Sequence, residues 1–335
     1  LSAVRRRDPA AGRALFTAAL AELDARERAR LLACLREGLD MADEACVTAL
    51  LQDRSKEVRQ TAAELLARLP ASAYVGGMTE RLAACLRSER KFLRSTWVLE
   101  PPETFDAAWK RDGLEETPTQ ADALGPRAWW LYQMARALPL AWWTAHSGMA
   151  PADLVKWAHA GDWSSALLRA WLEAVMRERD ADWAATLLDA QPPPSRPADE
   201  AHALIGMLAQ PAREQRWAAL LELGPRQQAR GELLARIARM QRAAGQALSV
   251  AFARRALRAV AHGLADEQAR WDTTLRTSLL EFACVLPLEC LDDAAQGWPA
   301  ERDDTRYFTE TLARLLTVVE QRRVLNRHFT EPGSP

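Results

Sequence analysis

The chain has few of the residues that mark disulfide-rich, metal-binding or membrane proteins. Its five cysteines, in 335 residues, form no CxxC pair and are odd in number, so neither a disulfide framework nor a zinc site is indicated. Cys34, Cys46 and Cys85 lie among apolar residues and are expected to be reduced core thiols. No apolar run approaches the ~20 residues that a membrane helix needs, and no secretory leader is recognisable. These absences predict a cytoplasmic protein.

The motifs of the commonest enzymes are also missing. The five histidines are scattered, none has another His or Cys at ligand spacing, and HExxH does not occur. A GxSxG elbow, a P-loop and a GxGxxG turn are all absent. Paired carboxylates such as Glu115 and Glu116 do occur, but adjacent residues on a helix do not face each other. The sequence therefore predicts a protein that is not an enzyme, with no catalytic residues, cofactor or metal.

The net charge of the chain excludes few further classes of function. The formal net charge is −1 at pH 7, so the whole chain carries no general signal for nucleic acid or an anionic membrane. Its length exceeds the size at which one hydrophobic core keeps growing, and 49% of its residues are hydrophobic. Either two domains or an elongated repeat array is expected.

What is present is a helical pattern, most clearly in residues 46–70. Val58, Ala62, Leu65, Leu66 and Leu69 recur at three- and four-residue spacings, which places them on one buried helix face. Residues 44–51 provide a partner helix, and Pro70 ends the second one. Asp53 and Ser55 are expected to accept the free N–H groups of its first turn. An Asp in such a turn followed by Val-Arg resembles the HEAT-repeat signature, which implies that Asp53 and Arg59 link neighbouring repeats.

Similar periodicity along the chain predicts an all-α protein built as an elongated, HEAT-like array of helical hairpins, an α-solenoid. We expect HEAT-like repeats in residues 1–90, a Trp-rich helical region with a long loop in 91–190, and a second helical lobe in 198–330. The sequence QPPPSRP between the last two is a proline-rich linker. Residues 182–188 return in similar form at 216–221, an offset of 34 that suits one hairpin per repeat, although chance similarity in an Ala/Leu-rich chain explains it about as well.

Four strings carry a resemblance to a known family: DPAAGRALF, GLDMADEACVTALLQDRSKEVRQTAAELLARLP, the loop at residues 109–113, and GPRAWWLYQMARALPLAWW. Together they resemble an uncharacterised bacterial family of HEAT-like α-helical proteins, of which DRSKEVR is the most specific part. The resemblance implies a location in the genome beside MoxR-type AAA ATPases, von Willebrand A domain proteins and SWIM zinc-finger proteins. It also implies that an amino-terminal segment is missing here. No activity is established for the family, so no catalytic residues carry over.

The first candidate site is the Trp-rich middle, where ten of the thirteen tryptophans lie between Trp97 and Trp183. Neighbours on a helix point about 100° apart, so one indole of each Trp pair can lie in the core and the other outside. The functional interpretation is a partner-binding groove, and the simpler one is that large aromatics fill gaps between irregular helices. The residues of this groove would be Trp129, Trp130, Trp142 and Trp143, rimmed by Arg111, Asp112 and Arg127.

The second candidate is a row of arginines between Pro225 and Val260, where eight arginines face one acid, Glu232. A phosphate backbone or an acidic partner would suit such a row, but a row of this kind more often pairs with acids of a neighbouring helix. The members of this candidate basic patch are Arg236, Arg239, Arg242, Arg254, Arg255 and Arg258. The sequence thus predicts a non-catalytic scaffold or adaptor for a protein partner, such as an AAA ATPase or a von Willebrand A domain protein. A nucleic-acid-binding repeat protein that uses residues 226–258 is the alternative, and no membrane partner is expected.

Overall fold

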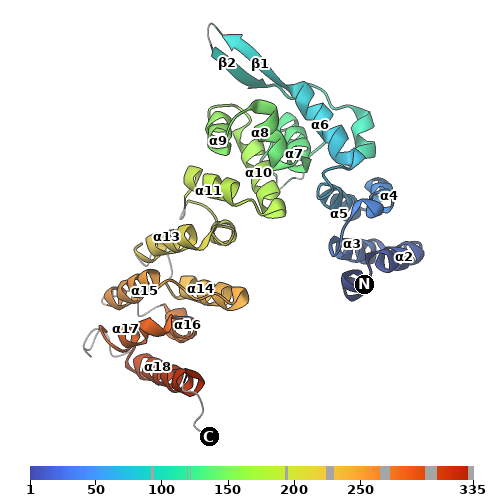
Figure 1. Ribbon diagram of the computed structural model, residues 1–335. Helices are drawn as coiled ribbons and strands as arrows, with labels where there is room; N and C mark the ends of the chain where they lie inside the picture. Colours follow the sequence, from blue (N-terminus) through green and yellow to red (C-terminus); the bar gives the residue numbers. More distant parts are fainter. Residues whose placement is uncertain are drawn as a thin grey trace. The chain divides into compact units, whose positions relative to one another are not determined.

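The fold is known from a computed structural model that describes residues 1–91, 94–118, 120, 122–192, 195–223, 230–264, 272–298 and 308–330. The chain is mostly helical, as the sequence predicts, and divides into two compact units, Leu1–Ala190 and Gln191–Pro335. We call them the amino-terminal and carboxy-terminal units (Figure 1). Among the described residues, no helix combines the length and the apolar character that crossing a bilayer requires.

The amino-terminal unit begins with six short helices joined by 3₁₀ turns. The core of this part comes from the faces that the periodicity of residues 46–70 predicts, because Val58, Ala62 and Leu66 are all fully buried. The helices are α1 (Ser2–Arg7), α2 (Pro9–Ala19), α3 (Ala25–Ala33), α4 (Glu44–Ala49), α5 (Lys56–Leu66) and α6 (Ala73–Cys85).

Local side-chain caps explain where several of these helices start. Asp8 accepts the N–H of Ala11 at α2, Asp24 forms a capping box with Glu27 at α3, and Ser72 caps α6. The cap expected at α5 is different. Asp53 accepts the N–H of Ser55, just before the helix, and Ser55 makes no side-chain cap. Asp53 therefore acts in the turn before the helix, and Ser55 occupies the N-cap without using its side chain.

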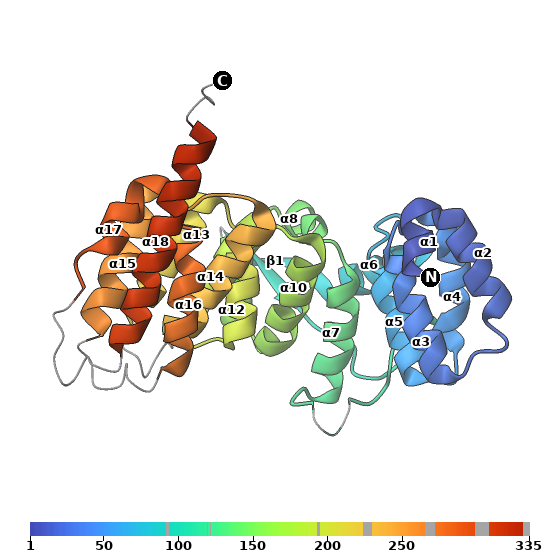
Figure 2. The same ribbon diagram turned by 90° about the horizontal axis from the view of Figure 1, so that it is seen from below.

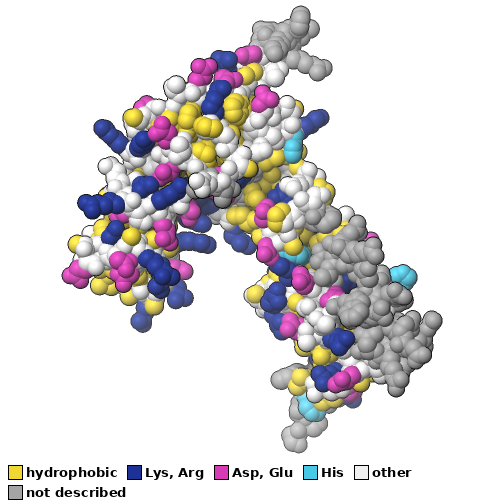
Figure 3. Space-filling view, turned by 180° about the vertical axis from the view of Figure 1, so that it is seen from behind, with side chains coloured by type: hydrophobic (Ala, Val, Ile, Leu, Met, Phe, Trp, Pro, Cys, Tyr) yellow, Lys and Arg dark blue, Asp and Glu magenta, His cyan; other side chains and the backbone are white. Residues whose placement is uncertain are grey.

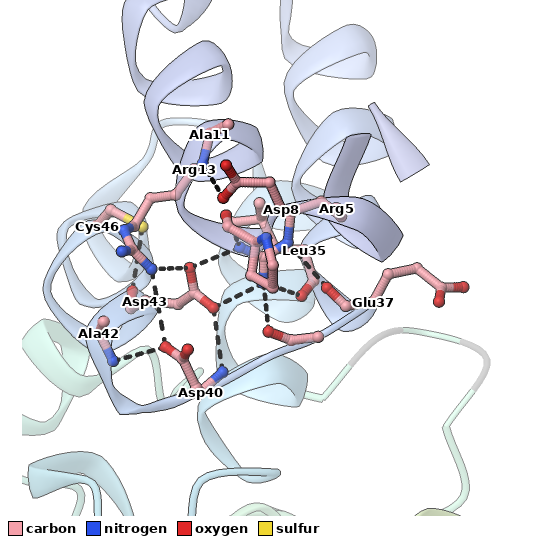
Figure 4. Close-up of polar contacts among 12 residues, drawn as sticks. Arg5, Asp8, Ala11, Arg13, Leu35, Glu37, Asp40, Ala42, Asp43 and Cys46 are labelled. Atoms are coloured by element: carbon pink, nitrogen blue, oxygen red, sulfur yellow. Dashed lines mark hydrogen bonds and ion pairs between the residues drawn. The ribbon is translucent and has the colours of Figure 1, made fainter. Parts of the chain in front are cut away.

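A buried ion pair ties α1 to the turns that follow α3 (Figure 4). Arg5 and Asp43 are fully buried and joined by two hydrogen bonds of 2.7 and 3.0 Å. The remaining donors of Arg5 reach four backbone oxygens, those of Pro9, Leu35, Glu37 and Gly38. Arg13 adds a second cation to Asp43 at 2.9 Å. Because the donors of Arg5 and the carboxylate of Asp43 all have hydrogen-bond partners, the two charges are tolerated inside the core.

An antiparallel hairpin continues directly from α6, formed by β1 (Leu86–Lys91) and β2 (Arg94–Leu99) (Figure 1). Leu86 lies opposite Leu99, and Ser88 opposite Trp97. The sequence indicates only residues 97–99 as strand-like, so the hairpin is a departure from a purely helical chain. A 3₁₀ helix at Ala107–Asp112 follows within the expected long loop, and Gly113 closes it in the left-handed region at φ +74°.

The rest of this unit is helical. Helix α7 lies alongside α10, as Figure 2 shows, and α9 contacts both α10 and α11. Arg177 of α10 also donates to the carbonyls of Arg136 and Leu138 at the end of α7. The helices are α7 (Pro126–Ala137), α8 (Leu140–Ser147), α9 (Pro151–His159), α10 (Ser164–Glu178) and α11 (Ala181–Ala190).

In the carboxy-terminal unit, helices pack on their second neighbours along the chain. Helix α13 contacts α15, α15 contacts α17, α14 contacts α16, and α16 contacts α18. The beginnings of the helices expected at 226–244 and 265–285, and that of the last one near 305, lie outside the described residues. The helices are α12 (Ala198–Ile205), α13 (Gln210–Leu221), α14 (Arg230–Ala244), α15 (Val250–Gly263), α16 (Thr273–Ala283), α17 (Leu291–Ala295) and α18 (Thr309–Thr330).

Candidate functional site

The two tryptophan pairs singled out by the sequence lie mainly in the core. Trp129 and Trp130 are each 6% exposed, and their indole N–H groups donate to the carbonyls of Glu115 and Glu116 at 2.9 and 2.7 Å. The expectation that one indole of a pair faces outward therefore fails for this pair, because the loop after Gly113 folds back over α7. In the second pair Trp143 is fully buried and Trp142 is half-buried, as the helical spacing predicts.

The three rim residues are not gathered around these indoles as one group. Arg111 is exposed, and Asp112 forms an ion pair with Arg81 of α6. Arg127 pairs with Glu100, donates to the carbonyls of Pro101 and Pro102, and places its guanidinium 5.2 Å from the ring of Trp163. Of the three, only Arg127 lies beside an aromatic residue at the molecular surface.

A pocket of about 330 Å³ lies between strand β2 and the turn that joins α9 to α10. We call it the strand pocket. Its apolar lining comes from residues of the same Trp-rich region that sequence reasoning did not select. The largest of them are Trp97, Leu99, Trp157, Trp163 and Leu167. The three tryptophans are half-buried, whereas Leu99 and Leu167 are buried. Pockets that bind ligands are commonly apolar with a few polar groups, which this one resembles.

Indole hydrogen bonds hold the walls of the strand pocket together. Trp157 donates to the carbonyl of Trp97 at 2.9 Å, and Trp163 donates to the carbonyl of Leu99 at 3.0 Å. Trp97 in turn donates to the carbonyl of Ser147 at the end of α8. Each indole is thus fixed in position by a backbone oxygen, so the pocket does not have to be organised when something binds.

Further aromatic side chains extend from the strand pocket along α8. Trp97 lies 5.5 Å from the ring of His146, and His146 stacks on Trp142 with ring centres 4.6 Å apart. His146 is exposed and both tryptophans are half-buried. Partly exposed indoles of this kind are the side chains most enriched at energetically dominant positions of protein interfaces.

The arginine row in the carboxy-terminal unit is largely neutralised. Arg236 pairs with Asp199, Arg242 with Glu281, Arg254 with Asp293 and Arg255 with Glu222. Arg239 and Arg258 form no ion pair within the described part of the chain. Basic and acidic side chains are likewise interspersed over the face that Figure 3 shows. The row therefore has much less free charge than its sequence indicates.

Asp53 and Arg59 both connect segments that are distant in the sequence. Asp53 accepts hydrogen bonds from Arg28 of α3, at 3.0 and 3.3 Å. Arg59 forms an ion pair with Glu115 at 2.5 Å and donates to the carbonyls of Asp53 and Arg54. The carboxylate of Asp53 and the guanidinium of Arg59 do not form an ion pair with each other. Asp53 pairs with Arg28, and Arg59 pairs with Glu115.

Three cysteine thiols of the described chain have raised pKa values. Burial raises the pKa of Cys85 to about 11, and burial also raises the pKa values of Cys46 and Cys290, which disfavours the reactive thiolate. Among the described residues, no group of three or more His, Cys, Asp or Glu side chains is placed to hold a metal ion.

Comparison with known proteins provides a family but no function. No curated protein matches the chain, and no solved structure matches it. A family of unknown function, DUF5691, matches residues 1–329, nearly the full length of the described helices from α1 to α18. The chain therefore belongs to this family of unknown function (DUF5691).

Proposed function

We propose that this protein is a non-catalytic, cytoplasmic scaffold or adaptor that binds another polypeptide, with the strand pocket as its contact site. The observation that carries the proposal is the pocket itself: three half-buried indoles, each fixed by a backbone carbonyl, around about 330 Å³ of space. A preformed aromatic pocket on a helical framework is suited to receiving one anchoring side chain of a partner.

The proposal includes a HEAT-like repeat architecture. Two features support it: second-neighbour packing of the helices from α13 to α18, and the way Asp53 and Arg59 connect separate hairpin segments. Each hairpin of a repeat array leaves one face for its neighbours, and the array presents an extended surface for partners. The partner classes that we propose, from the resemblance described above, are an AAA ATPase or a von Willebrand A domain protein.

Affinity capture of the protein from its native host, in mild salt and with parallel nuclease treatment, tests the proposal. The informative variant is Ala160→Tyr, because Ala160 is exposed and lines the strand pocket, so added bulk obstructs the pocket without removing a packed side chain. The matched control is Ala152→Tyr, at an exposed position of α9, the helix that Ala160 caps; Ala152 does not line the pocket.

We expect a nuclease-insensitive protein partner that is lost with Ala160→Tyr and retained with Ala152→Tyr. Retention of the partner by both variants, at unchanged melting temperature, would rule out the strand pocket as the contact site. Capture of nuclease-sensitive material alone would instead favour the alternative, a nucleic-acid-binding repeat protein. That alternative is supported only by the two arginines, Arg239 and Arg258, that lack an ion pair in the described chain.

A further inference from the structure

We propose that the strand pocket accepts a cationic side chain, arginine or lysine, from an extended segment of the partner protein. This inference rests on the proposed function and names the chemistry that the pocket recognises. Four features of the pocket point to it: its acidic residues, the helix end beside it, its aromatic walls and the outer edge of β2.

The charged residues that line the strand pocket are both acidic. Asp162 is exposed and has no ion pair or hydrogen bond within the described chain. Glu100 is also exposed and shares its charge with Arg127, which lies over Trp163. Asp162 is therefore the carboxylate that remains available, and no lining residue offers a positive charge to an anion.

The carboxyl end of α9 adds negative potential at the same place. Ala158, Ala160 and Gly161 belong to the pocket lining and form the last turn of this helix and its cap. A side chain at Gly161 would meet the carbonyl oxygens of Ala158 and Trp157 at 3.7 and 3.8 Å, so backbone oxygens lie close to this edge. The last carbonyls of a helix carry a partial negative charge that favours a nearby cation.

The aromatic walls of the strand pocket present the carbon faces of their indole rings to a ligand, and not N–H donors. The indole N–H groups of Trp157 and Trp163 are already bonded to the carbonyls of Trp97 and Leu99. An indole ring attracts a cation within about 6 Å of its centre. The guanidinium of Arg127, 5.2 Å from the centre of Trp163, shows that this ring already has a cationic neighbour.

The backbone of β2 indicates an extended occupant. Glu100 donates to the carbonyl of Cys85, and in an antiparallel pair the bonded positions alternate, so the backbone groups of Trp97 and Leu99 face away from β1. Their carbonyls accept the two indole N–H groups. In this register their own N–H groups face the same outer edge. A backbone carbonyl of an extended partner segment is suited to accept hydrogen bonds from these N–H groups at the edge of β2.

Peptide titration followed through the indole N–H signals of Trp157 and Trp163 in NMR spectra of the full chain tests this inference. The probes are acetyl-Gly-Arg-Gly-amide and its citrulline counterpart, which keeps the shape of the arginine side chain but has no charge. We expect saturable shifts of these two signals with the arginine peptide and none with citrulline at the same concentration. Asp162→Asn should weaken binding about two- to fivefold, as removal of one exposed ion pair does.

Asp153→Asn is the control, since Asp153 is an exposed carboxylate at the other end of α9 and does not line the pocket. It should leave the affinity unchanged. Equal binding of both peptides, or an affinity that does not respond to Asp162→Asn, would overturn the cationic assignment. If Ala160→Tyr still abolishes partner capture in that case, the proposed function stands and only its chemistry is wrong. If Ala160→Tyr leaves capture intact as well, the proposed site fails too.

Discussion

At the scale of single residues, the buried carboxylate of Asp43 makes the stability of the amino-terminal unit depend on its arginine partners and on pH. Burial by itself would raise the pKa of this carboxyl, but hydrogen bonds from Arg5 and Arg13 outweigh it and hold the pKa below its ordinary value. A group with a lowered folded pKa contributes stability above its unfolded pKa and loses it as pH falls. Asp43 therefore stabilises the fold at neutral pH and stops doing so in acid.

Replacing Asp43 with Asn should destabilise the protein strongly. The guanidinium of Arg5 would keep its charge in a site with no exposure and lose its counter-ion, a change that costs about 3–5 kcal/mol. Urea unfolding at pH 7 measures this loss. Asp40→Asn is the control, because the Asp40 side chain is 58% exposed and lies 3.7 Å from Arg13, so its ion pair is worth at most about 1 kcal/mol. Equal effects of the two changes would contradict the importance assigned to the buried pair.

His202 makes the stability of the carboxy-terminal unit depend on pH. Burial, and then the nearby charge of Arg236, lower its pKa from 6.5 to about 4. The unfolded chain therefore binds the proton first as the pH falls, and stability that is fully present above about pH 6.5 is lost towards pH 4. Each unit of pKa difference corresponds to about 1.4 kcal/mol, so the free energy of unfolding should fall by about 3 kcal/mol by pH 4.

Urea unfolding between pH 7.5 and pH 4.5 measures this dependence. His202→Leu should flatten the curve relative to the unmodified protein, whereas His262→Leu, at an exposed position of α15, should leave its slope unchanged. A His202→Leu protein with the original slope would show that other groups cause the acid sensitivity.

Sequence periodicity predicted the burial of single residues correctly in α5 but not in α7, and the difference has a physical reason. Helical periodicity correctly placed Val58, Ala62 and Leu66 in the core, because their burial depends on the face of one helix. The same reasoning failed for Trp129 and Trp130. Their burial depends on the carbonyls of Glu115 and Glu116 in a loop, and no periodic pattern encodes how that loop folds back.

At the scale of the element, two helical glycines should respond in opposite ways to the same change. Glycine in a helix interior is less favourable than alanine by about 1 kcal/mol, so alanine normally stabilises a helix. A Cβ atom added at Gly76 of α6 would meet no other atom within 4 Å, and Gly76→Ala should raise stability by about 0.5–1 kcal/mol.

Gly12 of α2 is different because an added carbon would meet Cδ and Cγ of the buried Arg5 at 2.4 and 2.7 Å. Arg5 cannot move aside without losing its bonds to Asp43. Gly12→Ala should therefore lower stability by about 1–3 kcal/mol despite its better helix propensity. Thermal unfolding of both variants measures the two signs, and a stabilised Gly12→Ala protein would refute the close packing of α1 on α2.

The β-hairpin shows the limit of reading elements from sequence. Residues 86–91, LRSERK, have no alternation of apolar and polar side chains, and only Trp97, Val98 and Leu99 favour a strand. The hairpin exists through pairing of β1 with β2 and through indole bonds from α9 and from the residue before α10. Such long-range contacts override local propensity, which is why the strand pocket was not predicted although its region was.

At the scale of the whole molecule, the chain separates into two units at Ala190 and Gln191. Each unit has its own set of fully buried residues, including Trp143 and Trp171 in one and Trp217 and Phe282 in the other. We expect residues 1–190 and 191–335, produced separately, each to unfold cooperatively with near-native helical content. Circular dichroism during heating measures this. A fragment without a cooperative transition would show that its core needs the other unit.

The sequence by itself determined the helical class, the buried faces of the helices and the absence of common catalytic motifs. It also marked the Trp-rich region as a candidate binding region. All of these follow from composition and local spacing. Only the tertiary structure decided that Arg5 is buried, that most of the arginine row is paired, and that Trp97, Trp157 and Trp163 surround a pocket. Each of these depends on partners that are tens of residues away, such as Asp43 for Arg5 and Asp293 for Arg254. Contacts between distant residues leave no periodic signal in one chain.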